Sequence, residues 1–195
     1  MRQFAIAIIV LLVVVLNSCN NNADAPKEAS KPTPLNKQEL IKRGEYLVQI
    51  TGCNDCHSPK KPGANGPELV PELALSGYSQ DMPIPQGDKN VLSAGFAVFA
   101  PDFTSAAGPW GVSFSANLTP DSATGLGGWT EDQFKKAFTQ GKYKGQDGGR
   151  MLLPPMPWPN YGKMADEDIK AVFAYLKNLK PVYNAVHPPI RPDKM

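Results

Sequence analysis

Residues 53–57, Cys-Asn-Asp-Cys-His, place two thiols and an imidazole within five consecutive positions. The whole chain has three cysteines and two histidines, so this stretch holds three of its five cysteine and histidine side chains. Such groups bind metals, exchange disulfides or attach a cofactor covalently. The spacing of the residues and their surroundings must distinguish these three chemistries.

Three interpretations compete for Cys53, Cys56 and His57. A structural zinc site needs about four ligands, and no second Cys/His pair lies near the motif. A redox dithiol begins a helix after a strand in a βαβ pattern, which the surrounding sequence lacks. The third interpretation is covalent haem attachment, for which Cys-x-x-Cys-His is the signature. In haem attachment the two thiols add to the two vinyl groups of the porphyrin, and the histidine becomes the proximal iron ligand. The signature therefore favours one covalent haem c.

A second axial ligand of the iron must then be found among the remaining methionines and His187. The candidates are Met82, Met151, Met156, Met164, Met195 and His187. Met156 lies in "MLLPPMPWPN", where prolines on both sides exclude a helix and stiffen the backbone around one thioether. We predict Met156 as the distal ligand, with Met151 and His187 as alternatives. Met164 begins the last predicted helix and is expected to pack there.

The N-terminus has the pattern of an export signal. Arg2 precedes an apolar run from Phe4 to Leu16, which is shorter than the roughly 20 residues of a membrane-spanning helix. Leu16-Asn17-Ser18-Cys19 resembles the lipobox of bacterial lipoproteins, in which the cysteine becomes the first mature residue and carries lipid. We expect residues 1–18 to be a signal peptide and Cys19 to be lipidated, with an uncleaved anchor as the alternative. Both place the remaining chain in the periplasm, at a membrane.

The remaining chain divides into a tether, one domain and a tail. Residues 19–35 are polar and proline-containing, which is typical of a disordered tether. Residues 36–181 are long enough for one domain, and residues 182–195 form a proline-rich tail. The net charge of +2 gives no indication of nucleic acid as a partner.

Helix signals bracket the haem motif and the methionine loop. Asn36 opens a capping box that predicts a helix over residues 37–50. Thr130 and Gly141 are the predicted start and stop of a second helix. A third is predicted within residues 165–181, with acidic residues at its start and lysines at its end. The fold class is therefore mainly α, with three to four helices around one covalent haem.

The stretch between Pro59 and Trp129 carries weaker signals. Short apolar alternation predicts a small inserted β-hairpin at about 94–117. Arg150, Trp129 and Trp158 are candidates for the haem surround, together with Trp110, because guanidinium and indole N–H groups donate to propionates. A separate set of lysines could ring the exposed haem edge and meet an acidic partner. These lysines are Lys60, Lys61, Lys142 and Lys144.

Three segments carry a resemblance to a known family: "GEYLVQITGCNDCH", "SANLTPDSATGLGGWTEDQFKKAFTQG" and "MPWPNYGKMADEDIKAVFAYLKNL". Over roughly residues 38–180 the chain resembles class I c-type cytochromes, and more closely the single-haem domains of bacterial dehydrogenase cytochrome subunits. The resemblance implies crossed first and last helices, a close approach that Gly44 would permit, and Met156 as distal ligand. Several relatives carry two or three haem motifs, whereas this chain carries one.

The expected function follows from an iron whose two axial positions are both occupied by protein ligands. His/Met ligation excludes direct binding of oxygen or substrate, so we expect an electron carrier and not an enzyme. A thioether ligand and an apolar pocket both favour ferrous iron and raise the potential. The expected partners are a dehydrogenase or a terminal oxidase. Two alternatives remain: a cytochrome subunit locked into a larger dehydrogenase, which would show a large apolar surface patch, and a haem sensor or enzyme with an open distal site.

Overall fold

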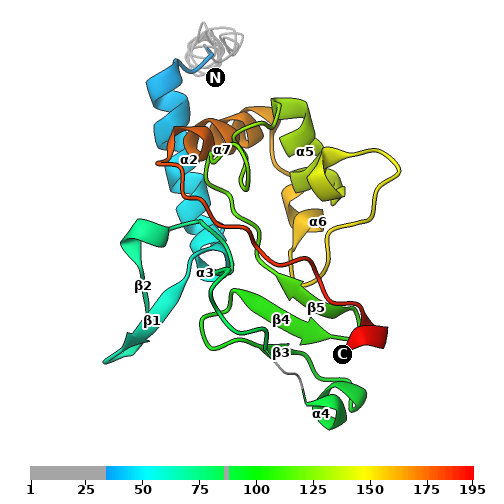
Figure 1. The fold of residues 1–195 in the computed structure, drawn as a ribbon. Helices are drawn as coiled ribbons and strands as arrows, with labels where there is room; N and C mark the ends of the chain where they lie inside the picture. The colour runs from blue at the N-terminus through cyan, green and yellow to red at the C-terminus, as the bar shows by residue number, and fades with distance from the viewer. Residues whose placement is uncertain (1–33, 86–87) are drawn as a thin grey trace, which may run out of the picture. The chain divides into compact units, whose positions relative to one another are not determined.

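The fold is described from a computed structural model that covers residues 34–85 and 88–195 (Figure 1). The predicted signal peptide, Cys19 and nearly all of the predicted tether lie outside these residues. Leu35–Met195 forms one compact unit. Among the described residues, none of the helices combines the length and apolar character needed to cross a bilayer.

Helices occupy both ends of this unit and strands lie between them. The helices are α2 (Lys37–Ile50), α3 (Cys53–His57), α4 (Lys89–Ser93), α5 (Glu131–Gln140), α6 (Trp158–Tyr161) and α7 (Asp166–Asn178), with 3-10 turns η2 (Pro71–Leu73), η3 (Tyr143–Gly145) and η4 (Pro192–Lys194). The strands are β1 (Lys60–Gly63), β2 (Gly66–Leu69), β3 (Val98–Phe99), β4 (Ser105–Gly108) and β5 (Gly111–Phe114).

The predicted helix boundaries are confirmed by their capping contacts. The Asn36 side chain accepts from the Glu39 N–H at 3.0 Å, and the Glu39 carboxylate accepts from the Asn36 N–H at 2.8 Å. Thr130 and Gln133 make the same reciprocal pair at the start of α5. Gly141 ends α5 in the left-handed conformation, at φ 69°. Each cap satisfies backbone N–H groups that a helix start leaves without partners.

Helices α2 and α7 cross at a contact that leaves no space for a side chain (Figure 1). A β-carbon at Gly44 would overlap the carbonyl oxygen of Ala171, so the predicted close approach of the first and last helices is confirmed. Helix α7 begins with the predicted acidic residues and buries Ile169, Val172 and Leu176. The two helices share one apolar cluster, to which α2 contributes the buried residues Leu47 and Val48.

Aromatic rings join α5 and α6 to this pair. Phe134 stacks on Phe138 at 5.2 Å between ring centroids and on Phe173 of α7 at 5.0 Å. Phe138 in turn stacks on Tyr161 of α6 at 4.5 Å. The Tyr161 hydroxyl donates to the carbonyl of Thr51, the residue that ends α2, at 3.3 Å. The row of rings therefore ties all four helices together.

The segment between Pro59 and Trp129, called the inserted segment below, contains more strand than predicted. The hairpin predicted at about 94–117 is confirmed as β4–β5, and β3 adds a third antiparallel strand in the order β3-β4-β5. A second hairpin, β1–β2, was missed entirely; it pairs Pro62 with Pro67 and Gly63 with Gly66. Its residues are mostly exposed and show no apolar alternation, so hydrophobic patterning could not reveal it.

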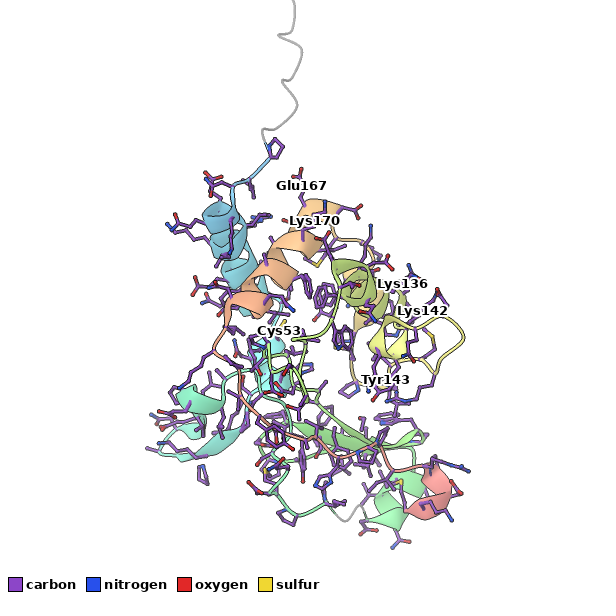
Figure 2. All side chains as sticks on the ribbon, turned by 45° about the horizontal axis from the view of Figure 1, so that its top comes forward. Cys53, Lys136, Lys142, Tyr143, Glu167 and Lys170 are labelled. Carbon is purple, nitrogen blue, oxygen red and sulfur yellow. The ribbon has the colours of Figure 1, made fainter. Side chains whose placement is uncertain are left out.

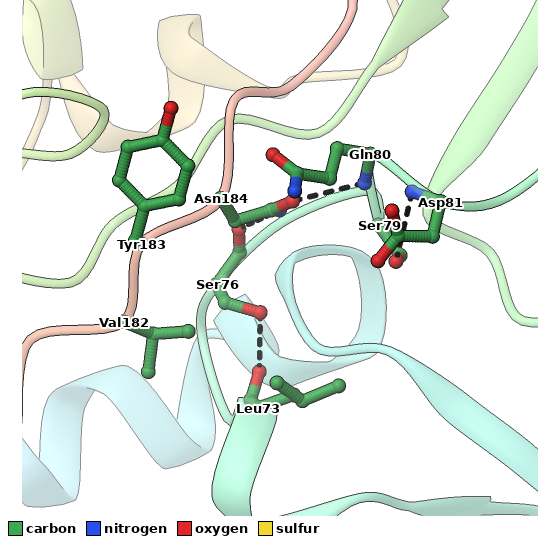
Figure 3. A pocket seen from close by; sticks show the side chains of 8 residues that line it. All are labelled: Leu73, Ser76, Ser79, Gln80, Asp81, Val182, Tyr183 and Asn184. Carbon is green, nitrogen blue, oxygen red and sulfur yellow. Dashed lines mark hydrogen bonds between the residues drawn. The ribbon is translucent and has the colours of Figure 1, made fainter.

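The C-terminal residues run back across the inserted segment. Val112 of β5 and Ile190 exchange backbone hydrogen bonds at 2.9 and 3.0 Å. The Asn184 side chain is buried and donates to the carbonyls of Ser76 and Tyr78 at 2.7 and 2.8 Å. Figure 3 shows Asn184 in the lining of a small pocket formed by this crossing. The crossing holds the inserted segment in place from its outer side.

The α2–α7 contact predicts a selective loss of stability in Gly44→Ala. The added methyl group meets backbone, which cannot move aside as a flexible side chain can, so we expect the free energy of unfolding to fall by about 1–3 kcal/mol. Gly128→Ala is the matched control, because a β-carbon there meets nothing within 4 Å and should change stability by less than about 0.5 kcal/mol. Denaturant unfolding measures both, and equal stability of the two variants would contradict the close contact.

Tyr161 predicts a stability loss at alkaline pH. Burial, aided by the nearby Cys53, Cys56 and Asp55, raises the pKa of Tyr161 from 10.0 to about 12. The folded protein thus keeps this proton longer than the unfolded chain, so the stabilisation is complete below pH 10 and is lost as the pH rises toward 12. Unfolding free energies measured from pH 9 upward should decline more steeply in wild type than in Tyr161→Phe. Tyr46→Phe, at an exposed position, should follow wild type.

Candidate haem-attachment site

The cysteines and histidine of the motif lie on one short helix, α3, directly after α2. Gly52 makes the turn between the two helices in the left-handed conformation, at φ 70°. Positions 53 and 56 are three apart, which puts Cys53 and Cys56 on one face of the helix. Both cysteines are partly buried.

His57 is held in the form that a metal ligand requires. Its Nδ1 lies 2.8 Å from the carbonyl oxygen of Ala116. A carbonyl only accepts, so Nδ1 carries the hydrogen and donates, which leaves the lone pair on Nε2 available. Desolvation lowers the pKa of His57 and outweighs the opposite effect of the Ala116 bond, so the ring is neutral at pH 7. A backbone carbonyl behind the imidazole is the usual orienting contact of a ligating histidine.

Buried contacts fix the end of the motif against residues 75–77. The Ser58 hydroxyl is fully buried; it donates to the Asn54 side chain and accepts from the Leu75 N–H, both at 2.8 Å. The Gly77 N–H donates to the His57 carbonyl at 2.7 Å. Gly77 has a φ of +82°, and a β-carbon there would overlap the Ser115 carbonyl. Hydrogen bonds from Leu75 and Gly77 therefore hold Ser58 and the backbone of His57 in place.

The thiols do not have the properties of a redox dithiol. Burial raises the pKa of Cys53 and of Cys56, whereas reactive Cys-x-x-Cys pairs have a lowered pKa. Within the described residues, no group of three or more His, Cys, Asp and Glu side chains could hold a metal ion. The structure thus gives no support to the dithiol or zinc interpretations, and the donor set fits a covalently held haem.

Met156 lies in the loop that precedes α6 and is partly buried. It packs against the same apolar cluster that Cys53 borders. The bond from Tyr161 to the Thr51 carbonyl ties α6 to the turn before Cys53. The proline-rich loop and the haem motif therefore adjoin the same apolar core, as a ligand from each would require. Ligation by Met156 itself stays a prediction.

The other ligand candidates occupy different surroundings. Met151 is 45% exposed and its backbone pairs with Lys142. Met164 packs against the apolar cluster, as expected. His187 lies against the rings of Tyr78 and Phe114, at 6.0 and 5.9 Å between centroids. Met82 lies in the inserted segment and Met195 ends the chain.

The predicted haem surround is only partly free for that role. The Arg150 guanidinium lies 3.6 Å from the centroid of the ring of Tyr143 (Figure 2). Trp129 packs on the apolar cluster, and the Trp158 ring covers Gly141. The Trp110 indole N–H donates to Ser113 at 3.3 Å. The role of Trp110 in the haem surround stays a prediction.

The four lysines proposed to ring the haem edge differ in their contacts, and the ring itself stays a prediction. The Lys60 ammonium donates to four backbone carbonyls. Lys142 (labelled with Lys136 in Figure 2) pairs with Asp147, which also pairs with Lys136 at 3.1 Å. Lys61 is exposed. Two of the four lysines are thus engaged within the chain, which sequence alone could not show.

Comparisons with known proteins find one matching family and several similar cytochrome subunits. The sequence model of the family "Cytochrome c" matches residues 41–180. The chain is 32% identical to the gluconate 2-dehydrogenase cytochrome c subunit of Pantoea cypripedii over 90% of its own length. It is 28% identical to the fructose dehydrogenase cytochrome subunit of Gluconobacter japonicus over 93%, and to the cytochrome c subunit of the quinone alcohol dehydrogenase of Gluconobacter oxydans over 74%.

These matches confirm the resemblance that the motifs indicated. The chain spans 30% of the length of the first two relatives and 23% of the third. All three names describe a cytochrome subunit of a dehydrogenase. The family match covers most of the chain and includes the Cys53–His57 motif and Met156. The chain therefore belongs to the cytochrome c family, whose members carry haem c.

Proposed function

We propose that this chain is a monohaem cytochrome c that transfers single electrons by outer-sphere exchange. The observation that carries the proposal is the arrangement of His57, which follows Cys53 and Cys56 on α3 and donates Nδ1–H to the Ala116 carbonyl. That bond reserves Nε2 for iron. Cys53 and Cys56 would form the thioethers, and Met156 would supply the second axial ligand.

The chain's own residues provide what an electron carrier needs. A haem held between histidine and methionine supplies one-electron exchange without an open coordination position. The stacked rings of α5, α6 and α7 and the α2–α7 contact exclude water and hold the two ligand-bearing segments in place. A rigid site limits the rearrangement that accompanies each electron transfer.

The proposed location is the periplasmic side of a bacterial membrane. The apolar run after Arg2 and the lipobox-like Leu16–Cys19 support export and lipidation at Cys19. Residues 20–35 would then tether the cytochrome domain to the membrane. Lipoproteins carry more than one acyl chain, and two or more chains give the stable anchoring that one chain does not.

The first test is the optical spectrum of the holoprotein. Wild type should show a covalent c-type haem and the weak methionine-to-iron charge-transfer band. Met156→Ala should lose that band and bind carbon monoxide in the ferrous state, because a coordination position opens. Met151→Ala is the control, at an exposed methionine five residues earlier, and should keep the band. A wild type that lacks the band or binds carbon monoxide readily would support a sensor or enzyme instead.

A second candidate function is a cytochrome subunit within a dehydrogenase complex. Half of the twelve exposed large apolar residues of the described chain fall within residues 84–103, on α4, β3 and the adjoining loops. They are Ile84, Val91, Phe96, Val98, Phe99 and Phe103. The Phe99 and Phe103 rings lie 6.1 Å apart, and Phe96 bonds to Val91 through the backbone. Soluble monomers rarely expose a large contiguous apolar surface, so this segment favours a protein partner.

Purification from the native host tests the complex. Wild type should co-purify with a dehydrogenase whose sugar or alcohol substrate reduces the haem. Phe96→Ser/Phe99→Ser should keep the haem spectrum and elute alone, because the apolar contact is lost. Tyr183→Ser is the matched control, with 66% exposure against 64% for Phe96. A wild-type protein that elutes alone and is not reduced by such substrates would leave the free carrier as the function.

A further inference from the structure

The Lys60 ammonium lies among backbone carbonyls close to the haem motif. It donates to the carbonyls of Asp55 at 2.7 Å, Asp102 at 2.8 Å, Ser58 at 3.0 Å and Asn54 at 3.4 Å. An ammonium has three N–H donors, so these carbonyls satisfy all of them. The side chain is only partly exposed. Such an arrangement fixes both the place of the charge and the backbone around it.

Two of these carbonyls belong to the haem motif itself. Asn54 and Asp55 stand between Cys53 and Cys56 on α3. The last carbonyls of a helix lack partners within the helix, and a lysine beyond its end can satisfy them. The Asp102 carbonyl lies in the loop before β4. Lys60 therefore joins the attachment motif to the inserted segment.

A carboxylate accompanies this ammonium. The Asp102 side chain is 5% exposed and accepts from the N–H and hydroxyl of Thr104 at 3.1 and 2.9 Å. Desolvation lowers the pKa of Lys60, and attraction to Asp102 acts against that effect. These bonds hold the Lys60 ammonium against the motif and the Asp102 carboxylate against Thr104, and the two groups carry opposite charges.

We propose that Lys60 is a positioning residue that fixes the haem motif from outside, and that its charge raises the reduction potential while Asp102 lowers it. The proposal rests on the proposed haem attachment at Cys53, Cys56 and His57. A positive charge near the iron disfavours the more positive ferric state, and a negative charge favours it. The Lys60 ammonium bonds directly to carbonyls of the motif and Asp102 is buried, so salt screens these charges less than it screens fully exposed ones.

The test compares midpoint potentials of the holoproteins by spectroelectrochemical titration. Lys60→Met should lower the potential and Asp102→Asn should raise it, while the double variant returns toward wild type. An expected tenfold change in the ferrous-to-ferric ratio at fixed external potential corresponds to about 59 mV for one electron. Lys61→Met is the control, since it removes the same charge from the exposed neighbour, and should shift the potential less. Opposite shifts are the decisive readout, because loosening of the structure would move both variants in one direction.

Covalent haem in the wild type is measured first and separates the two proposals. If no haem attaches to Cys53 and Cys56, the proposed function fails. If haem attaches but Lys60→Met and Asp102→Asn shift the potential in the same direction, or no more than Lys61→Met, the role of Lys60 fails. If Lys60→Met yields no holoprotein, Lys60→Arg must keep the wild-type potential and Asp102→Asn must still raise it; any other pair of results overturns the proposal.

Discussion

The hydrogen bond from His57 to the Ala116 carbonyl is the contact on which the arrangement of the site depends. It requires that the residues after β5 pass directly behind the haem motif. Gly77 supports that course, because only a residue without a side chain fits between the motif and Ser115. The inserted segment thus forms the wall against which the His57 imidazole is held. The inserted segment, which carries only weak signals in the sequence, therefore helps to position His57.

The opposite wall of the site is built from helices. Tyr161 links α6 to the end of α2, and the stacked rings carry that link through α5 to α7. Met156 and Cys53 border one apolar cluster as a result. The proposed ligands come from segments about 100 residues apart, so their relative position depends on helix packing and not on local sequence. The α2–α7 crossing at Gly44 governs that packing.

The features that the sequence predicted are those determined by residues close to one another in the chain. The caps at Asn36 and Thr130, the stop at Gly141 and the acidic start of α7 all follow from near neighbours in the chain. The haem motif was visible because its chemistry needs five consecutive positions. The carbonyl of Ala116 carries no side-chain signal, so its role could not be predicted. The hairpin β1–β2 has no apolar periodicity, and the carbonyls around Lys60 come together only in the folded chain.

The crossing of α2 by α7 and the return of residues 182–195 over the inserted segment have a consequence for the order of assembly. In the chain, α7 and Asn184 follow the haem motif by more than 100 residues. Until they dock, α2 has no partner for its apolar face, and the Ser76 and Tyr78 carbonyls lack the amide that satisfies them. The domain therefore cannot close around the motif before α7 and Asn184 have docked. Cys53 and Cys56 stay accessible on an open chain until then, which is the interval in which an attachment enzyme could reach them.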